Sequence, residues 1–599
     1  MNYCSNRLVY QRRLTREVKV GGVGIGGSNP IRIQSMITCD TMDTEASIAQ
    51  TMELARVDCE IVRITAPTVK DAANLQQIAR GLRERGCDVP IVADIHFKPE
   101  AAMEAAKWVD KVRINPGNYA DSKKFVTREY TDEQYTAELT RIRQRFTPLV
   151  LLCKERGIAM RIGTNHGSLS DRILNRYGDT PLGMVESALE FARIARDFDY
   201  HDFVFSMKSS NPKVMIAAYR LLVARLDEEG ADWNYPLHLG VTEAGEGEDA
   251  RIKSAIGIGS LLADGIGDTI RVSLTEDSIH EIPVARALAE IAPRLAQDSS
   301  LATRHASLPF DPFSYNRRAS ERIRRVGIAL GGSELVRVFI RRSEHEKIAH
   351  KIDRMGDYKP EVIYENAGVV EVDPRDDAEI ATINGSPEPR LVTVKDSIEL
   401  PVVAAFRLLA SKLQARHPIL LKDVFEGGRR KAEGGRDFLN TLLTAATNIG
   451  SLLCDGIGDA VLVQGEEAPG QSMRLSYNIL QAAGTRIFKT DYVACPSCGR
   501  TLFNLQTTTA RIKEATLHLK GVKIAIMGCI VNGPGEMADA DFGYVGGAPG
   551  KVNLYVGKTP VKFNIPEAQA VERLKDLIRE HGKWVEPAAP VSSSAEAFV

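Results

Sequence analysis

The stretch from Leu237 to Leu274 reads LHLGVTEAGEGEDARIKSAIGIGSLLADGIGDTIRVSL and contains a complete strand–helix–strand unit. Its pattern predicts a strand from Leu237, a helix over residues 248–264 and a second strand from Asp268. Short apolar runs that alternate with helices are typical of parallel sheets. This stretch therefore predicts an α/β fold built from repeated βα units.

The same alternation extends over residues 31–273. Helices are expected over 45–57, 70–85 and 184–197, and six more strands are expected to begin at Ile31, Glu60, Pro90, Lys111, Ala159 and Phe203. Eight βα units over this length predict a (β/α)8 TIM barrel, with an open doubly wound sheet as the alternative. We take residues 1–294 as this barrel, which we expect to bind the substrate.

An internal repeat marks the region that follows the barrel. GIGSLLADGIGDTIRV from Gly257 returns as NIGSLLCDGIGDAVLV from Asn448. A match of this length indicates duplicated structure, so residues 295–485, called the insert below, are expected to be a structural α/β domain derived from a barrel. Leu462 and Gln464 replace Arg271 and Ser273 of the first copy. Because this removes a polar pair suited to an anion, the insert is expected to carry no active site.

The sequence pattern changes again after the insert. Residues 486–585, called the C-terminal domain below, combine CPSCGR, a predicted strand KIAIMGC and a Gly/Pro turn VNGPGE, which predicts a small α+β domain. Residues 586–599 are rich in Ala, Pro and Ser and are expected to be disordered.

Composition narrows the class of protein. The 599 residues hold 77 Lys and Arg against 78 Asp and Glu, a balance that gives no electrostatic footprint for nucleic acid. No apolar run is long enough to span a bilayer, and the N-terminus lacks the apolar core of a secretory signal. We therefore expect a cytoplasmic enzyme without membrane or nucleic-acid partners. Six of the nine cysteines are scattered, as expected for reduced thiols.

The other three cysteines form a candidate metal site. Cys495 and Cys498 make a C-x-x-C pair, and Cys529 follows a predicted strand. Glu536 ends an N-G-P-G-E turn shortly afterwards. The alternative is a structural zinc site, but such a site would normally recruit a fourth Cys or His. Incomplete thiolate ligation favours a working cluster, with Glu536 as a replaceable fourth ligand.

Cations recur at the carboxyl ends of the predicted barrel strands, namely Arg63, Arg113, Arg161, Lys208 and Arg271. These ends converge at one mouth of a barrel, and Arg forks match phosphate oxygens, so a diphosphate is the expected ligand. The alternative for any single cation is an ion pair with a strand-end acid. Further candidate substrate-binding residues are His96, Asn165, His166, Ser168 and Ser273.

Two carboxylates near the same mouth are candidates for proton transfer. Glu243 is the first choice as proton donor, and Asp94 is the second candidate catalytic residue. An ion pair with Arg271 is the alternative for Glu243.

The motifs IQSM, DIHF, VRINPGN, RIGTNHGSL, SMKSSN, GVTEAGEG, CPSCGR and VNGPGE together resemble those of the bacterial and plastid 4-hydroxy-3-methylbut-2-enyl diphosphate synthases. The resemblance implies that Glu243 is a catalytic acid. It also implies that Cys495, Cys498, Cys529 and Glu536 hold a 4Fe-4S cluster in the C-terminal domain. The implied substrate-binding residues are Arg63, Arg113, Arg161, Asn165, Lys208, Arg271 and Ser273.

The resemblance also implies a reaction. 2-C-Methyl-D-erythritol 2,4-cyclodiphosphate would be reduced by two electrons to 4-hydroxy-3-methylbut-2-enyl diphosphate in the non-mevalonate (MEP) isoprenoid pathway, with reduced ferredoxin or flavodoxin as donor. The insert is similar to that of the long form found in plants and some bacteria. It would then take the structural place of the partner subunit on which short forms rely.

Two other classes remain open at this stage. A pterin-type barrel transferase with a structural zinc domain would use the same strand-end cations, and a zinc-stabilised binding module would use only the cysteines. The colour of the purified protein distinguishes them, because an iron–sulfur protein is brown and a zinc protein is colourless.

Overall fold

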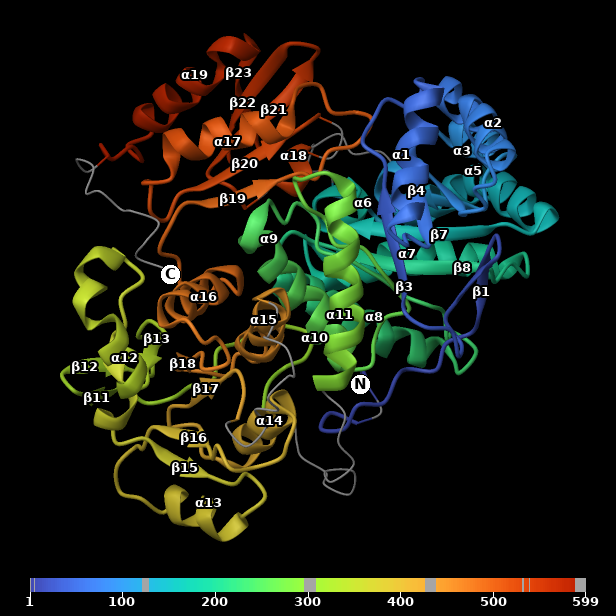
Figure 1. The fold of residues 1–599 in the computed structure, drawn as a ribbon. Coiled ribbons are helices and arrows are strands. Elements are labelled where there is room, and N and C mark those ends of the chain that lie inside the picture. Colours follow the sequence, from blue (N-terminus) through green and yellow to red (C-terminus); the bar gives the residue numbers. More distant parts are fainter. Residues whose placement is uncertain are drawn as a thin grey trace.

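A computed structural model describes residues 2–4, 6–120, 129–295, 309–425, 438–530, 533–537 and 539–587. The barrel, the insert and the C-terminal domain form three bodies in contact with one another (Figure 1). Most of the predicted disordered tail, residues 588–599, lies outside the described residues, as do Val531 and Asn532 of the predicted turn. No helix in the described ranges is both long and apolar enough to cross a membrane.

The first body is a barrel of parallel strands. Its eight-stranded sheet has the order β8-β7-β6-β5-β4-β3-β10-β9, and a bridge between Phe205 and Leu237 joins the two end strands. This closure confirms the predicted (β/α)8 fold over the open sheet. The strands are β3 (Arg32–Met36), β4 (Ile61–Thr65), β5 (Ile91–Asp94), β6 (Lys111–Ile114), β7 (Ala159–Asn165), β8 (Phe203–Lys208), β9 (His238–Leu239) and β10 (Thr269–Ile270).

Helices surround the barrel, and local sequence signals fix their ends. Capping boxes at Thr68 and Thr131 start α2 and α5, and Gly157 in the left-handed conformation ends α5. The predicted helix over 184–197 begins three residues earlier, because Thr180 caps it and Pro181 fits its first turn. The main helices are α1 (Thr44–Arg56), α2 (Val69–Glu84), α3 (Pro99–Ala105), α5 (Asp132–Arg156), α7 (Pro181–Asp197), α8 (Pro212–Glu229), α9 (Gly247–Ser254), the π-helical turn η2 (Ala255–Gly259), α10 (Ser260–Ala263) and α11 (Glu281–Leu295). Shorter helical segments are α4 (Pro116–Tyr119), η1 (His166–Ser168), α6 (Asp171–Tyr177) and η3 (Ser278–His280).

An N-terminal hairpin of β1 (Val18–Val20) and β2 (Val23–Ile25) closes one end of the barrel. Its apolar side chains pack against Ile61, Val92 and Val204, which belong to the amino halves of barrel strands. A ligand can therefore enter only from the carboxyl ends of the strands.

The insert is an incomplete barrel. Its parallel strands run in the order β14-β13-β18-β17, and a bridge between Val392 and Ile419 continues the sheet into the β16–β15 pair. A second hairpin, β11 (Ile323–Arg325) with β12 (Ile328–Leu330), precedes it as β1 and β2 precede the first barrel. The other elements are β13 (Arg337–Ile340), α12 (Arg342–Ile348), η4 (Ala349–Met355), β14 (Val362–Ile363), η5 (Tyr364–Asn366), β15 (Val370–Val372), α13 (Asp377–Asn384), β16 (Val392–Val394), α14 (Val402–Lys412), β17 (Leu420–Lys422), α15 (Phe438–Cys454), β18 (Ala460–Leu462) and α16 (Pro469–Ala482).

The two copies of the sequence repeat adopt the same backbone and face each other. Gly265 and Gly456 have φ of +79° and +78°, and Gly267 and Gly458 have φ of +128° and +123°. The hydroxyls of Ser260 and Ser451 lie 2.7 Å apart across the contact between barrel and insert. The duplicated helices thus form the interface between the two bodies.

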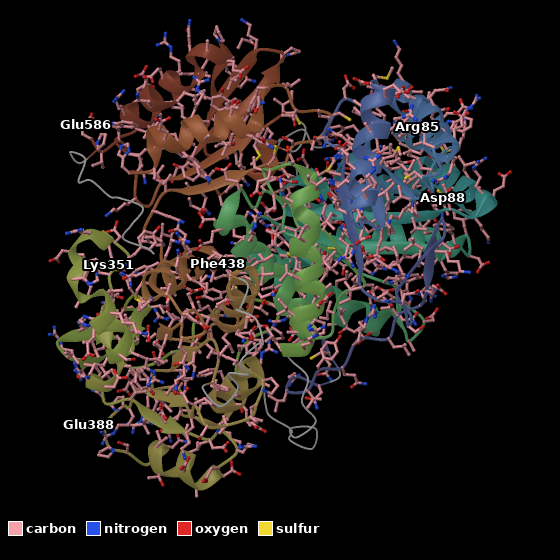
Figure 2. The ribbon with its side chains drawn as sticks, in the orientation of Figure 1. Arg85, Asp88, Lys351, Glu388, Phe438 and Glu586 are labelled. Atoms are coloured by element: carbon pink, nitrogen blue, oxygen red, sulfur yellow. The ribbon has the colours of Figure 1, made fainter. Side chains whose placement is uncertain are left out.

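The C-terminal domain is a mixed sheet in the order β19-β20-β21-β22-β23, whose first two pairings are parallel and last two antiparallel. Helices α17 and α19 contribute Leu505, Ile512, Leu574 and Ile578 to its main core. The elements are β19 (Asp491–Ala494), α17 (Leu505–Thr516), β20 (Lys523–Met527), α18 (Gly533–Glu536), β21 (Phe542–Ala548), β22 (Lys551–Val556), β23 (Thr559–Pro566) and α19 (Glu567–Glu580). Charged side chains cover its outer surface as they cover that of the other two bodies, and Glu586 lies at its edge (Figure 2).

Candidate active site

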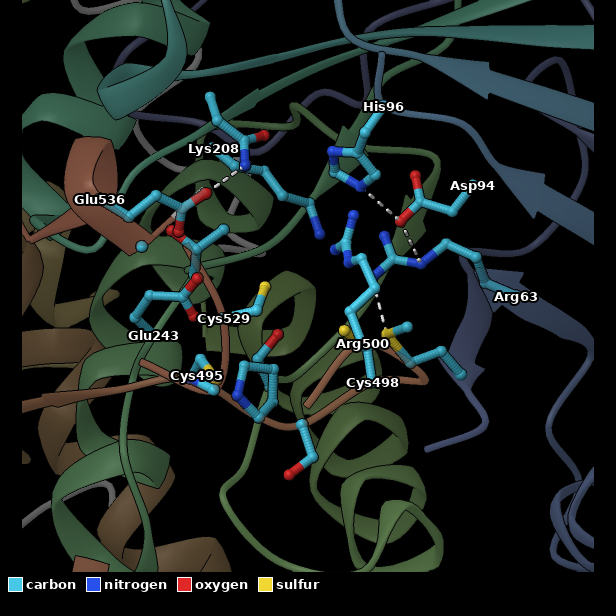
Figure 3. A pocket seen from close by; sticks show the side chains of 18 of the residues that line it. Arg63, Asp94, His96, Lys208, Glu243, Cys495, Cys498, Arg500, Cys529 and Glu536 are labelled. Carbon is cyan, nitrogen blue, oxygen red and sulfur yellow. Dashed lines mark hydrogen bonds and ion pairs between the residues drawn. The ribbon is translucent and has the colours of Figure 1, made fainter. Parts of the chain in front are cut away.

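A cavity lies between the mouth of the barrel and the C-terminal domain. Figure 3 shows Arg63, Asp94 and His96 from the barrel opposite the three cysteines of the C-terminal domain. The predicted site residues that line this cavity are Arg63, Asp94, His96, Arg113, Arg161, Asn165, Lys208, Glu243, Arg271, Ser273, Cys495, Cys498, Cys529 and Glu536.

The strands explain why residues so far apart in sequence meet. Arg113 and Arg161 are register partners on β6 and β7, and Asn165 and Lys208 are partners on β7 and β8. Side chains alternate along a strand, so residues two or four apart point to the same interior. Arg271 and Ser273 lie just beyond β10, which ends earlier than predicted, at Ile270. The backbone N–H of Leu274 then bonds to Glu281 and that of Thr275 to Gly245.

Direct contacts hold the C-terminal domain on the barrel of the same chain. The Asn165 amide donates a hydrogen bond of 2.5 Å to Glu536. A parallel bridge joins Ala244 after β9 to Ala494 of β19. A Cβ added to Gly535 would lie 1.7 Å from the carbonyl oxygen of Gly167, so the two turns touch through their backbones.

Asp94 anchors the cations on one side of the cavity. Its carboxylate accepts a hydrogen bond of 2.9 Å from Arg113 and lies 3.6 Å from Arg63. Although burial opposes its charge, Arg113 and Arg63 hold the pKa of Asp94 well below the usual range. An ionised, paired carboxylate is a poor proton donor, so the geometry does not favour the predicted catalytic role for Asp94. Burial lowers the pKa of neighbouring His96 to about 3, which leaves this imidazole neutral.

Two other cations are less well compensated. The Nε and Nη1 atoms of buried Arg161 have no hydrogen-bond partner. Burial and then the charges of Arg161, Arg63 and other arginines hold the pKa of Lys208 well below its usual range. This excess of positive charge inside a closed cavity fits a polyanionic ligand.

Glu243 was interpreted either as a proton donor or as an ion-pair partner of Arg271, and the structure bears on both. Arg271 directs its fork at Glu281 of α11, with N–O distances of 3.1 and 2.9 Å, and so pairs with that residue instead of Glu243. Burial and then the neighbouring carboxyl of Glu536 raise the pKa of Glu243 well above the usual range. Glu243 also has a φ of +51°, a conformation that side chains adopt at a cost. A carboxyl whose pKa is raised at the mouth of the cavity can act as an acid.

The cysteines lie on the face of the cavity that the C-terminal domain provides. Burial opposes the thiolate of Cys498, but the charge and hydrogen bonds of Arg500 lower its pKa below the ordinary value. Burial and then Glu243 raise the pKa of Cys495. The Oε2 atom of Glu536 is buried without a hydrogen-bond partner among the described residues. Three thiols and one unsatisfied carboxyl oxygen thus face a common space.

Two predicted substrate-binding residues point elsewhere. The Ser168 hydroxyl accepts a hydrogen bond of 2.7 Å from Asn115 and does not line the cavity. His166 turns towards Asp179, at 3.2 Å. Both lie in the short helix η1 (His166–Ser168), whose turn rotates them away from the direction set by β7.

Arg500 was missed. It lines the cavity from the C-terminal domain, two residues after Cys498. Its place in the CPSCGR motif was the available signal, but sequence alone does not tell which way a loop side chain points.

Fold and site together define a class: a (β/α)8-barrel enzyme whose cationic mouth is closed by a cysteine-bearing domain of the same chain. The sequence model of the GcpE TIM-barrel domain family matches residues 15–286. The sequence model of the GcpE protein C-terminal domain family matches residues 491–580. The insert separates the two matches.

Relatives that match over nearly the whole chain point to the same family. The chain is 60% identical over 587 residues to the 4-hydroxy-3-methylbut-2-en-1-yl diphosphate synthase (flavodoxin) of Akkermansia muciniphila, covering 98% of this chain and 99% of the relative. It is 44% identical to the enzyme of that name from Chlorobaculum tepidum, covering 96% and 90%. It is 42% identical to the chloroplastic ferredoxin-type enzyme of Arabidopsis thaliana, covering 98% and 89%. The chain belongs to the 4-hydroxy-3-methylbut-2-en-1-yl diphosphate synthase family.

Proposed function

We propose that this chain reductively opens 2-C-methyl-D-erythritol 2,4-cyclodiphosphate to give 4-hydroxy-3-methylbut-2-enyl diphosphate, with reduced flavodoxin or ferredoxin as electron donor. One observation carries the proposal: strand-end cations and three cysteines line a single cavity. The cations suit the diphosphate, and the cysteines suit a redox group. The relatives' names support the product and both types of donor.

The residues present fit the 4Fe-4S cluster that this family uses. Cys495, Cys498 and Cys529 would supply thiolates, and Glu536 would supply a carboxylate oxygen. Among the described residues, no three His, Cys, Asp or Glu side chains converge closely enough to hold a single metal ion. A structural zinc ion requires such convergence, whereas each ligand of a four-iron cluster binds a different iron. When bound, the cluster would supply electrons one at a time beside the substrate.

The chain's own residues would bind and orient the substrate and would donate a proton to it. Arg63, Arg113 and Arg161 would hold the diphosphate, with Asp94 fixing the first two of these cations. Glu243 would donate a proton to the oxygen that leaves as water, because burial and the neighbouring Glu536 raise the pKa of its carboxyl. The closed C-terminal domain would exclude bulk water during reduction.

We also propose the division into a barrel (1–294), an insert (295–485) and a cluster-bearing C-terminal domain (486–585). The mouth of the insert supports a structural role for it. There Lys422, which is fully buried, pairs with Asp396 at 2.9 Å, and Asp396 also pairs with Arg341. Gln464 donates a hydrogen bond to the same carboxylate. Because these groups satisfy one another, neither of these two described cations is free for a diphosphate.

Anaerobic reconstitution tests the function. We expect a brown protein with about four irons and four sulfides per chain, which turns over the cyclodiphosphate with reduced flavodoxin. Cys529→Ser should lose the cluster and the activity, while Glu536→Gln should assemble a cluster that is more easily lost. A colourless zinc protein without turnover would contradict the proposal.

A further inference from the structure

Arg500 enters the cavity from the opposite side to the other cations. Its side chain extends from the turn that carries Cys498 towards His96 and Asp94 of the barrel (Figure 3). The Nε and Nη1 atoms of its guanidinium are buried and have no hydrogen-bond partner in the part of the chain that the structure describes. A buried Arg fork with free N–H groups is costly unless a ligand completes it.

The neighbours of Arg500 satisfy only part of its fork, because it hydrogen-bonds to Cys498 while Nε and Nη1 stay unpaired among the described residues. Asp94, a barrel carboxylate whose charge acts on Arg500, already bonds to Arg113 at 2.9 Å and faces Arg63 at 3.6 Å. Glu281 is occupied by Arg271, at 2.9 Å. In the described ranges no carboxylate forms an ion pair with Arg500 within 4.0 Å, whereas its free N–H groups line the cavity.

The position of Arg500 adds a further positive charge to the cavity. The barrel already places Arg63, Arg113, Arg161, Lys208 and Arg271 around the cavity. Bringing a further buried cation among them is repulsive at low effective dielectric. A bound diphosphate reverses the sign of this interaction, since its oxygens accept hydrogen bonds from Arg forks of both bodies. Contact between Arg500 and the diphosphate would therefore couple domain closure to substrate binding.

We propose that Arg500 is a substrate-binding residue supplied by the C-terminal domain, which donates its free N–H groups to the diphosphate and so favours the closed arrangement once substrate is bound. This inference rests on the proposed function, since it takes the cyclodiphosphate as the ligand. It assigns to the CPSCGR motif a second task beyond its two cysteines.

The test compares Arg500→Gln and Arg500→Lys with Arg511→Gln, which removes an exposed charge from α17 of the same domain. Iron and sulfide analysis first establishes equal cluster content. Calorimetric titration of the oxidised holoenzyme with the cyclodiphosphate then gives Kd. Losing hydrogen bonds to a charged group should weaken binding by about 10- to 100-fold in Arg500→Gln. Arg500→Lys should lose less, and Arg511→Gln should match wild type.

Hydrogen exchange provides a readout of closure. In wild type, substrate should protect the peptides around Ala244 and Ala494, whose backbones bridge barrel and C-terminal domain. This protection should be reduced in Arg500→Gln at saturating substrate. Wild-type affinity and protection in Arg500→Gln would overturn the proposal. So would loss of the cluster in Arg500→Gln combined with normal binding by a cluster-loaded Arg500→Lys, because the charge would then serve the cluster alone. Wild-type enzyme that fails to bind the cyclodiphosphate would instead refute the proposed function.

Discussion

At the scale of single residues, Lys208 differs from the arginines around it because an ammonium group can lose its proton and a guanidinium effectively cannot. Burial and the charges of Arg161 and Arg63 hold its pKa well below the usual range. In the substrate-free cavity the ammonium form is thus less favoured than in an exposed lysine. A bound diphosphate would place negative charge beside it and restore the ammonium form.

We therefore predict that substrate binding raises the pKa of Lys208 and is accompanied by proton uptake at this residue. Calorimetric titrations in buffers of different ionisation enthalpy should give different binding enthalpies, and their slope should correspond to about one proton. Lys208→Met should bind more weakly and should lose this uptake. Equal proton uptake in wild type and Lys208→Met would assign the proton to another group.

The close approach of Gly167 and Gly535 is a second effect of single residues. A Cβ on Gly535 would lie 1.7 Å from the Gly167 carbonyl oxygen, and one on Gly167 would lie 2.1 Å from the Gly535 carbonyl carbon. Backbone cannot yield to such an overlap as the end of a side chain can. Either substitution must therefore displace the turn that carries Glu536.

The Gly535→Ala variant should keep the three cysteine thiolates and much of the cluster. Its kcat should fall by about 100-fold, because a displacement of roughly 1 Å between reacting groups has an effect of this size. Steady-state kinetics and cluster absorbance on the same sample would measure this. Gly22→Ala is the control, since a Cβ there would meet nothing within 4 Å. Full turnover by Gly535→Ala would show that this contact does not form during catalysis.

At the scale of elements, the repeated helices build a buried charge network between barrel and insert. Arg220 of α8 bonds to Asp264 at 2.8 Å and to Asp455 at 2.7 Å, and Arg407 of α14 bonds to the same two carboxylates, each at 2.7 to 2.9 Å. Asp264 and Asp455 are equivalent positions of the repeat. The duplication thus gives each body one half of a self-complementary contact.

Arg407→Ala should destabilise the protein by about 3–5 kcal/mol, because it leaves buried carboxylates short of a partner. Thermal unfolding of the holoenzyme should show a lower Tm and a less cooperative transition as the insert loosens. Arg324→Ala removes an exposed arginine of the insert and should leave Tm unchanged. An unchanged Tm in Arg407→Ala would mean that packing alone holds this interface.

At the scale of the whole molecule, one chain contains both halves of the site. The barrel mouth offers cations and the C-terminal domain offers thiols, and the bridge between Ala244 and Ala494 joins them within the same chain. Figure 1 shows the C-terminal domain beside the barrel and also above the insert. The insert occupies a face of the barrel through a two-fold-like contact, as a second barrel would.

We predict that Arg271→Leu and Cys529→Ser cannot complement each other. Each variant should be inactive alone, and mixing the purified proteins at equal concentration should restore no turnover, because neither chain has a complete cavity. Mixing each variant with wild type controls for inhibition. Substantial recovery in the mixture would show that the site is shared between chains and would refute the interpretation of the insert as a substitute for a second subunit.

The sequence by itself determined the barrel, the repeat and most of the cavity. Strand period and parallel direction place Arg63, Arg113, Arg161 and Lys208 at one mouth wherever the remaining parts of the chain lie. The spacing of Cys495 and Cys498 likewise put two thiols on one turn. These conclusions needed only local geometry, which neighbouring residues fix.

The tertiary structure alone decided what depends on distant contacts. Asn165 and Glu536 are 371 residues apart, and their hydrogen bond exists only because the C-terminal domain docks on the barrel. Docking also places Glu536 beside Glu243 and brings Arg500 into the cavity, while α11 supplies Glu281 to Arg271. The physical reason is that the state of a buried charge depends on every group packed around it, and sequence spacing fixes only the groups on its own element.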